Sequence, residues 1–226
     1  MKTITYIMFL TLALILSAKG QILTNGVYVE NGKTFEVIDS SHKTTSDTNS
    51  EVLYFSNELI IKLHTNSDFI IDNFSQEILN TNNTPEKVVF GSHNFSATLV
   101  NGTIIITYAG GDSNSSCVLS TPMTDFELSK GTFYIKVDEN KVLAVVLNGS
   151  LKSSNKGREI VVTTGHSIVA IPNGIGILED KISFYVGETT LSEATELNAE
   201  SKDITKLKDT IMFALIDGKI VGIVIH

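Results

Sequence analysis

The segment from Thr121 to Gly165 reads TPMTDFELSKGTFYIKVDENKVLAVVLNGSLKSSNKGREIVVTTG. It contains short runs of β-branched and aromatic residues, and Pro, Gly, Asn or Asp separates each run from the next, as in strands joined by turns. Thr132–Val137 alternates apolar and polar side chains, so this strand is expected to bury one face. Leu143–Leu147 is apolar throughout, which indicates a strand that is buried on both faces.

The same turn signals recur along the whole chain. Asn-Gly favours the positive φ angles of a type I′ turn, which joins two antiparallel strands. Hairpins are therefore predicted at Asn31-Gly32, Asn101-Gly102, Asn148-Gly149 and Asp217-Gly218, with a longer turn at Asp138–Lys141. The flanking strands are expected at 26–30 and 34–38, 96–100 and 103–108, 142–147 and 150–153, and 211–216 and 219–225. These repeated hairpins predict an all-β fold, either a β-sandwich or a short β-roll.

Two other regions depart from the strand pattern. Between Leu191 and Thr210 the apolar residues are spaced for one face of a helix, which predicts one or two short helices interrupted near Asn198 and Ser201. The polar stretch Ser40–Ser50 carries too little apolar surface to order itself and is expected to be an exposed loop.

The N-terminus predicts export. Lys2 precedes the apolar run Ile4–Leu16, and Ser17–Gly20 supplies small residues for cleavage after Gly20. The run is shorter than the roughly 20 residues of a spanning helix, so a signal peptide over residues 1–20 is favoured over an uncleaved anchor. Without the two leader lysines the chain has 15 basic and 25 acidic residues, a net charge of −10. This charge disfavours nucleic acid and anionic lipid as partners.

The order of the turn and strand signals resembles that of the FecR domain, the extracytoplasmic module of bacterial iron-transport regulators. The matching elements are Thr121-Pro122, Gly131-Thr132-Phe133, Val142–Val146, Leu147–Leu151 and Thr164–His166. The match is good over 121–165 and looser over 59–172. The resemblance implies a FecR-like domain over 21–180 and a C-terminal extension over 181–226.

The resemblance implies structural roles for the motif residues and no chemistry. These residues are Thr121, Pro122, Gly131, Thr132, Phe133, Val145, Gly149 and Gly165. Complete regulators of the family begin with a cytoplasmic helical segment that holds a sigma factor. An export leader stands at that end of this chain, so the resemblance extends to the extracytoplasmic fold and leaves the link to a sigma factor open.

One segment resembles the nucleophile block of secreted GDSL-type esterases. Gly111-Asp112-Ser113-Asn114 follows an apolar strand, but that family needs a helix after the serine and an Asp-x-x-His near the C-terminus. Here Ile223 stands three residues before His226. A serine hydrolase that uses Ser113 is kept as an alternative, although the composition of the segment is that of a turn.

The sequence gives little indication of a metal-binding site or a redox-active cysteine. Asp112, Asn114 and Ser116 have the alternate spacing of a calcium loop but lack its later Gly and Glu. The five histidines, His42, His64, His93, His166 and His226, show no metal-ligand spacing. Cys117 is the only cysteine and is expected to point inward from a strand.

The sequence therefore predicts a non-enzymatic, exported FecR-like protein in the periplasm or cell envelope. It would act as an interaction, scaffolding or signalling-related module, and its expected partner is another envelope protein. No cofactor is expected, and the sequence does not indicate an oligomeric state. The alternatives are the Ser113 hydrolase and a small-ligand or calcium-binding β-protein.

Overall fold

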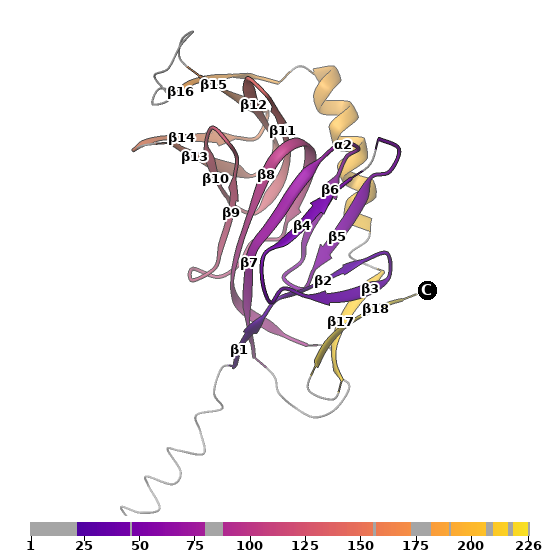
Figure 1. The fold of residues 1–226 in the computed structure, drawn as a ribbon. Coiled ribbons are helices and arrows are strands. Elements are labelled where there is room, and N and C mark those ends of the chain that lie inside the picture. Colours follow the sequence, from indigo (N-terminus) through magenta and orange to yellow (C-terminus); the bar gives the residue numbers. More distant parts are fainter. Residues whose placement is uncertain are drawn as a thin grey trace, which may run out of the picture.

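The computed structural model describes residues 22–45, 47–79, 88–155, 157–172, 182–189, 191–206, 210–216 and 219–225. Within these ranges the chain forms many short strands and one helix (Figure 1). This confirms the predicted all-β class. The described helix is too short and too polar to cross a membrane.

The strands form two sheets that share the long strand β8. Sheet A contains β1 (Ile22–Asn25), β4 (Ser41–Thr44), β7 (Asp68–Ile78), β8 (Phe90–Tyr108), β9 (Ser116–Ser120), β10 (Asp125–Leu128), β13 (Ser150–Asn155) and β14 (Arg158–Thr163). Sheet B contains β2 (Val27–Glu30), β3 (Lys33–Glu36), β5 (Glu51–Phe55), β6 (Leu59–Leu63), β8, β11 (Gly131–Asp138), β12 (Lys141–Asn148), β15 (His166–Pro172) and β16 (Ile182–Glu188). Helix α2 (Leu191–Thr205) and a hairpin of β17 (Ile211–Ile216) and β18 (Lys219–Val224) complete the described fold.

The order of strands in sheet A is β7, β8, β9, β10, β13 and β14, with β1 and β4 both on the free side of β7. In sheet B the order is β3, β2, β5, β6, β8, β11, β12, β15 and β16. All of these pairs are antiparallel except β8 with β9. Strands β14 and β16 therefore end the two sheets, and both lie at the same end of the molecule (Figure 1).

The predicted hairpin at Asn101-Gly102 is wrong, because β8 runs through both residues as one 19-residue strand. Its first half pairs with β7, and its second half pairs with β6 and β11. Only Gly102 has a positive φ, of 99°, whereas a type I′ turn requires positive φ at both central residues. The glycine instead lets β8 pass from sheet A to sheet B against Ser67, whose hydroxyl accepts from the Thr103 amide and donates to the Thr103 carbonyl.

Of the other predicted Asn-Gly and Asp-Gly turns, some join paired strands and one does not. Asn31 and Gly32 have φ of 49° and 74° and join β2 to β3 in the predicted hairpin. The predicted Asn148-Gly149 hairpin is wrong: only Gly149 has a positive φ, and β13 pairs with β10 and β14 rather than with β12. Strands β11 and β12 form the predicted hairpin, with Asp138 opposite Lys141. Strands β17 and β18 also pair as predicted, although Asp217-Gly218 lies outside the described residues.

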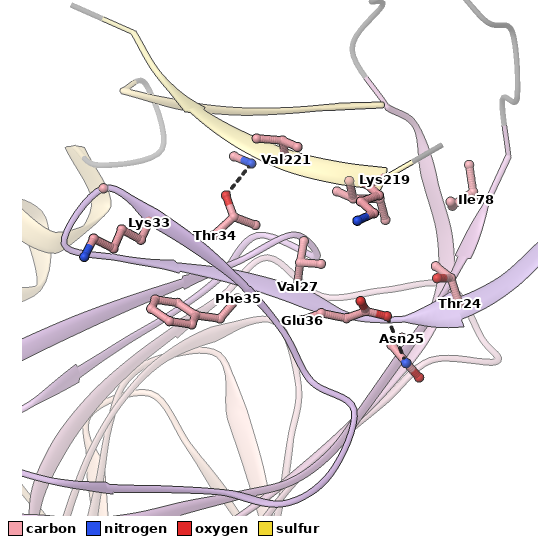
Figure 2. A pocket seen from close by; sticks show the side chains of 13 residues that line it. Thr24, Asn25, Val27, Lys33, Thr34, Phe35, Glu36, Ile78, Lys219 and Val221 are labelled. Carbon is pink, nitrogen blue, oxygen red and sulfur yellow. Dashed lines mark hydrogen bonds between the residues drawn. The ribbon is translucent and has the colours of Figure 1, made fainter. Parts of the chain in front are cut away.

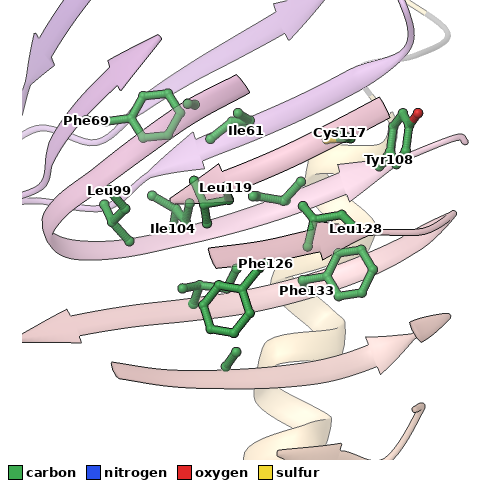
Figure 3. Close-up of a cluster of buried hydrophobic side chains, with 14 of the residues drawn as sticks. Ile61, Phe69, Leu99, Ile104, Tyr108, Cys117, Leu119, Phe126, Leu128 and Phe133 are labelled. Atoms are coloured by element: carbon green, nitrogen blue, oxygen red, sulfur yellow. The ribbon is translucent and has the colours of Figure 1, made fainter. Parts of the chain in front are cut away.

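The main hydrophobic core lies between the two sheets. Figure 3 shows Phe69, Leu119 and Phe126 from sheet A among Ile61, Ile104 and Phe133, which belong to sheet B. Cys117 is 2% exposed in this core, as the sequence predicts. Because both sheets send alternate side chains into one shared core, the arrangement is that of a two-layer β-fold.

A second core covers the outer face of sheet B. Its buried members are Val27, Val29, Tyr54, Ile60, Ile105, Ile204 and Phe213. They come from sheet B, from α2 and from β17, so the helix and the C-terminal hairpin cover one face of this sheet. The helix is continuous from Leu191 to Thr205, so the predicted interruption is wrong. Ser201 is 7% exposed and lies one turn before Ile204.

The predicted exposed loop at Ser40–Ser50 is wrong in its first half. Ser41–Thr44 forms β4 and pairs with β7 from Asp68 to Ile71. Thr45 is buried, and its hydroxyl accepts from the Ser67 amide at 2.8 Å. Backbone pairing to β7 thus orders a segment that contributes little apolar surface.

Candidate functional site: an open strand edge and two clefts

Three motif glycines meet where the chain crosses between the sheets. A β-carbon on Gly131 would lie 2.2 Å from the carbonyl oxygen of Asn148, and one on Gly149 would lie 2.1 Å from that of Lys130. Gly165, with a φ of 81°, donates its amide to the Val146 carbonyl at 2.9 Å. Gly131 and Gly149 therefore permit close backbone contact, Gly165 permits a positive φ, and none of the three presents a reactive group.

The remaining motif residues lie in two other places. Thr121 and Pro122 form the turn between β9 and β10, where the Thr121 hydroxyl donates to the Thr124 carbonyl at 2.6 Å. Phe133 is fully buried in the main core, and its neighbour Thr132 lies at a register shift in β11. Val145 is 5% exposed on β12. All of these are positions in the scaffold.

The candidate nucleophile Ser113 is exposed in a turn. The Asp112 carboxylate beside it accepts from the Asn114 amide and from the Ser115 hydroxyl, each at 3.0 Å. No histidine within the described ranges forms a hydrogen bond with Ser113. Ser116 donates to Asn94 at 2.9 Å. Among the residues that the structure describes, no group of three His, Cys, Asp or Glu side chains could hold a metal ion.

The histidines are dispersed, and each described one has its own contact. His42 pairs with Asp68 at the surface, and the His166 ring contacts the Thr164 carbonyl at 3.2 Å. His64 Nε2 lies 3.3 Å from a carboxylate oxygen of Glu200 on α2. His226 lies outside the described residues.

His93 is the most buried of these histidines, with 4% of its surface exposed. Its Nε2 lies 2.7 Å from the hydroxyl of Tyr108. Burial lowers the pKa of His93 and raises that of Tyr108, so it favours the neutral form of both groups, which share this hydrogen bond. The Gly91 backbone opposes the shift in the pKa of His93 but does not cancel it. Position 93 alternates with the buried Phe95, a pattern in the sequence that could have predicted its inward direction.

The first cleft separates the β2–β3 hairpin from β18 and encloses about 710 Å³ (Figure 2). Phe35, Val27 and Val221 line it together with Lys33 and Lys219. The Gly222 amide donates to the Thr34 hydroxyl at 2.8 Å and joins the two hairpins. The Asn25 side-chain Nδ2 donates to the Glu36 carboxylate at 3.0 Å. No buried side-chain polar atom that lacks a partner lies among the lining residues that the structure describes.

The second cleft encloses about 900 Å³ and contains His93, so we call it the His93 cleft. Its described lining residues are Tyr54, Ser56, Asn57, Glu58, Leu79, Val88, Val89, Phe90, Gly91, His93, Ala109, Gly110, Gly111, Asp112, Ile211, Met212 and Phe213. They come from the turn after β5, from both ends of β8 and from β17. The cleft therefore exists only where the C-terminal hairpin packs against sheet B.

Strand β16 ends sheet B and pairs only with β15 within the described ranges. Its sequence, ISFYVGE, has no basic residue and no proline, and its only charged side chain is the terminal Glu188. Tyr185 is 58% and Val186 50% exposed. The sequence interpretation missed this strand, although a β-branched and aromatic run of this kind is a strand signal.

Comparisons with known proteins give no family assignment. No protein-family model matches the chain, and no curated protein matches it. Two crystal structures of candidate anti-sigma factors from Parabacteroides distasonis ATCC 8503 are similar to it. One has a TM-score of 0.45 at 8% identity and covers 83% of this chain and 100% of its own. The other has a TM-score of 0.43 at 7% identity and covers 82% of this chain and 100% of its own.

Proposed function

We propose that the protein is an exported, non-enzymatic interaction module that binds another envelope polypeptide along the open edge of β16. The observation that carries this proposal is the exposed, apolar edge strand at the end of sheet B. An unpaired strand edge offers a row of backbone donors and acceptors to an extended partner segment.

The composition of β16 supports binding at this edge. Soluble proteins usually protect edge strands with charged residues, proline or short length. Tyr185 and Val186 instead expose apolar surface over the middle of a seven-residue strand. Backbone hydrogen bonds to β16 would give an added strand its affinity. Contacts between the side chains of that strand and those of β16 would give specificity.

The other ends of the sheets carry the protection that β16 lacks. Strand β14 begins with Arg158 and Glu159, and Glu159 lies 3.5 Å from Lys152 of the neighbouring strand. Strands β1, β3 and β4 have only four residues each; β3 and β4 also include Lys33 and Lys43, whereas β1 is protected by its short length alone. These differences favour β16 over the other edges as the contact strand.

The cellular compartment in this proposal rests on the sequence. The apolar run Ile4–Leu16 and the small residues up to Gly20 have the form of a secretory leader. The net negative charge suits an exported soluble domain. The partner is therefore expected to be a protein of the periplasm or cell envelope, and a signalling-related role is compatible with such contact.

Site-directed photo-crosslinking in the host that secretes the protein tests this proposal. A benzoylphenylalanine at Glu188, at the end of β16, is expected to form a discrete adduct with one protein. Adding Tyr185→Lys should remove the adduct, because a charged side chain in mid-strand blocks strand addition. The variant must be secreted in the same amount as the unmodified protein. It must also have the same thermal transition, which shows that it is folded.

The matched control places the same crosslinker at Val161 of β14. This residue is 64% exposed and apolar, but its strand carries charged neighbours. Equal adducts at both positions, or an adduct at Glu188 that survives Tyr185→Lys, would contradict binding along β16.

A further inference from the structure

The inner face of β16 is only partly covered by the rest of the protein. Ile182 and Phe184 pack against the main core, although both stay partly exposed. Val186 also points toward the core, because it is paired with Ile168 of β15 and paired side chains share a face. Ile168 is 1% exposed, whereas Val186 is 50% exposed. Coverage of the core side of sheet B therefore ends between these two strands.

The last strand of the opposite layer is better covered. On β14, which lies at the same end of the molecule (Figure 1), Val162 is 1% exposed and Ile160 packs against the main core. A further strand beside β16 would place its inward side chains next to Phe184 and Val186, because directly opposite side chains lie on one face, roughly 5 Å apart. Apolar side chains at those positions would continue the core by one strand.

Glu188 supplies the charge at this end of sheet B. Strand β15, HSIVAIP, contains no Asp, Glu, Lys or Arg, and Glu188 is the only such residue in β16, ISFYVGE. Glu188 is exposed and lies on the same face as Val186, because it is two residues further along the strand. Opposite charges directly across two strands stabilise their pairing, and like charges destabilise it. An added strand is therefore favoured if it places a basic residue opposite Glu188.

We propose that the polypeptide bound by β16 is an extended segment with the pattern basic-x-apolar-x-apolar, read from its N-terminus. The inference rests on the proposed strand addition at β16 and identifies the class of its partner. Antiparallel pairing is the more frequent kind and is that of β15 with β16. In this direction the three residues lie opposite Glu188, Val186 and Phe184. A second copy of β16 does not fit the pattern, because this strand has no basic residue.

Three fluorescently labelled, capped peptides test the pattern by anisotropy titration with the unmodified protein. The first, Thr-Lys-Thr-Val-Thr-Ile-Thr, has the proposed pattern. The second, Thr-Lys-Thr-Thr-Val-Ile-Thr, has the same composition with the apolar residues adjacent, so that only one of them can face the core. The third replaces the Lys of the first by Glu. The first peptide is expected to bind about twofold to fivefold more tightly than either of the others.

Variants of the protein locate the peptide on β16. Val186→Thr keeps the branched shape and places a hydroxyl on the inner face, so it should weaken binding of the first peptide about twofold to fivefold. Val161→Thr makes the same change at a 64% exposed valine of β14 and should leave the affinity unchanged. Glu188→Lys should reverse the preference, so that the Glu peptide binds more tightly than the Lys peptide. Each variant must keep the thermal transition of the unmodified protein.

Several outcomes would overturn this partner pattern. They are failure of the first peptide to bind at millimolar concentration, equal binding of the first two peptides, and a charge preference that Glu188→Lys does not reverse. A dimer in sedimentation velocity that Tyr185→Lys abolishes would assign the edge to a second copy and would also overturn the pattern. If the crosslinked adduct at Glu188 forms while the peptides fail, strand addition stands and only the pattern is wrong. If no adduct forms, strand addition itself is wrong.

Discussion

His93 shows how one buried polar residue is accommodated in the fold. Its Nε2 shares a hydrogen bond with the Tyr108 hydroxyl, and the Gly91 backbone also contributes to its environment. Burial favours the neutral form of the ring. The cost of burying the imidazole is therefore offset by its hydrogen bonds, provided that the ring stays uncharged.

This arrangement predicts acid sensitivity near neutral pH. Burial lowers the pKa of His93 below its ordinary value of 6.5, and burial likewise lowers the pKa of His64. Below that ordinary value both histidine rings bind a proton in the unfolded chain but remain neutral in the native protein until the pH reaches their lower native pKa values. Stability is therefore full above about pH 6.5, falls as the pH is lowered and levels off below the folded pKa values.

The variant His93→Gln tests the contribution of this ring. Its amide can accept from Tyr108 and donate to Gly91 at every pH. Urea unfolding between about pH 7.5 and 5 should show a slope of stability against pH that is smaller by up to about 1.4 kcal/mol per pH unit. His166→Gln, at an exposed ring, should leave the slope as it is. An unchanged slope in His93→Gln would show that this ring does not sense pH.

At the scale of elements, glycines lie where strands cross between the sheets, and neighbouring atoms occupy the positions that their β-carbons would take. Gly131 begins β11 with the Asn148 carbonyl oxygen where its β-carbon would stand. Gly187 lies in β16, where nothing occupies the 4 Å around that position. Each glycine lies in a strand, and the two differ in whether another atom occupies the position of the missing β-carbon.

Gly131→Ala is therefore expected to lower the free energy of unfolding by about 2–3 kcal/mol, because the backbone of Asn148 must shift. Gly187→Ala should change it by no more than about 0.5 kcal/mol, or raise it slightly by restricting the unfolded chain. Chemical denaturation of the two variants compares them directly. Equal effects of the two substitutions would mean that the crossing at Gly131 is not tightly packed.

At the scale of the whole molecule, the C-terminal part covers one face of sheet B. Phe213 of β17 is 6% exposed and stacks on Tyr54 of β5. The Val88 amide donates to the Phe213 carbonyl at 3.1 Å, which ties the hairpin to the segment before β8. We therefore expect the C-terminal segment to unfold together with the two sheets.

Phe213→Ala tests this coupling. It is expected to lower the free energy of unfolding by about 3–5 kcal/mol in one cooperative transition. Ile216→Ala, at a 41% exposed position of the same strand, serves as the control and should cost little. If residues 181–226 are an independent extension, the main transition will be unaffected by Phe213→Ala.

Local patterns in the sequence were sufficient for the fold class and for many individual faces. The alternation of Phe133, Ile135 and Val137 predicted their burial, because side chains on a strand point alternately to its two sides. The inward position of Cys117 followed from the same reasoning. The Asn31-Gly32 hairpin was predictable because both its angles and its strand pairing are local.

The sequence did not determine whether each Asn-Gly pair forms a hairpin turn or a crossing between the two sheets. Gly102 and Gly149 have positive φ like Gly32, but they carry the chain from one sheet to the other. The choice between hairpin and crossing depends on which strands offer backbone partners, and those strands lie far away in the chain. Local propensity therefore could not distinguish the two outcomes.

The candidate sites likewise depend on the tertiary structure. Composition determined the acidic charge of the chain and its single thiol. Only the packing of β17 against β5 and β8 places Asn57, Asp112 and Phe213 around one cleft. Only the order of the strands leaves β16 at the end of its sheet. Both sites arise from contacts between distant segments, whereas the pattern of a strand reports only its own two faces.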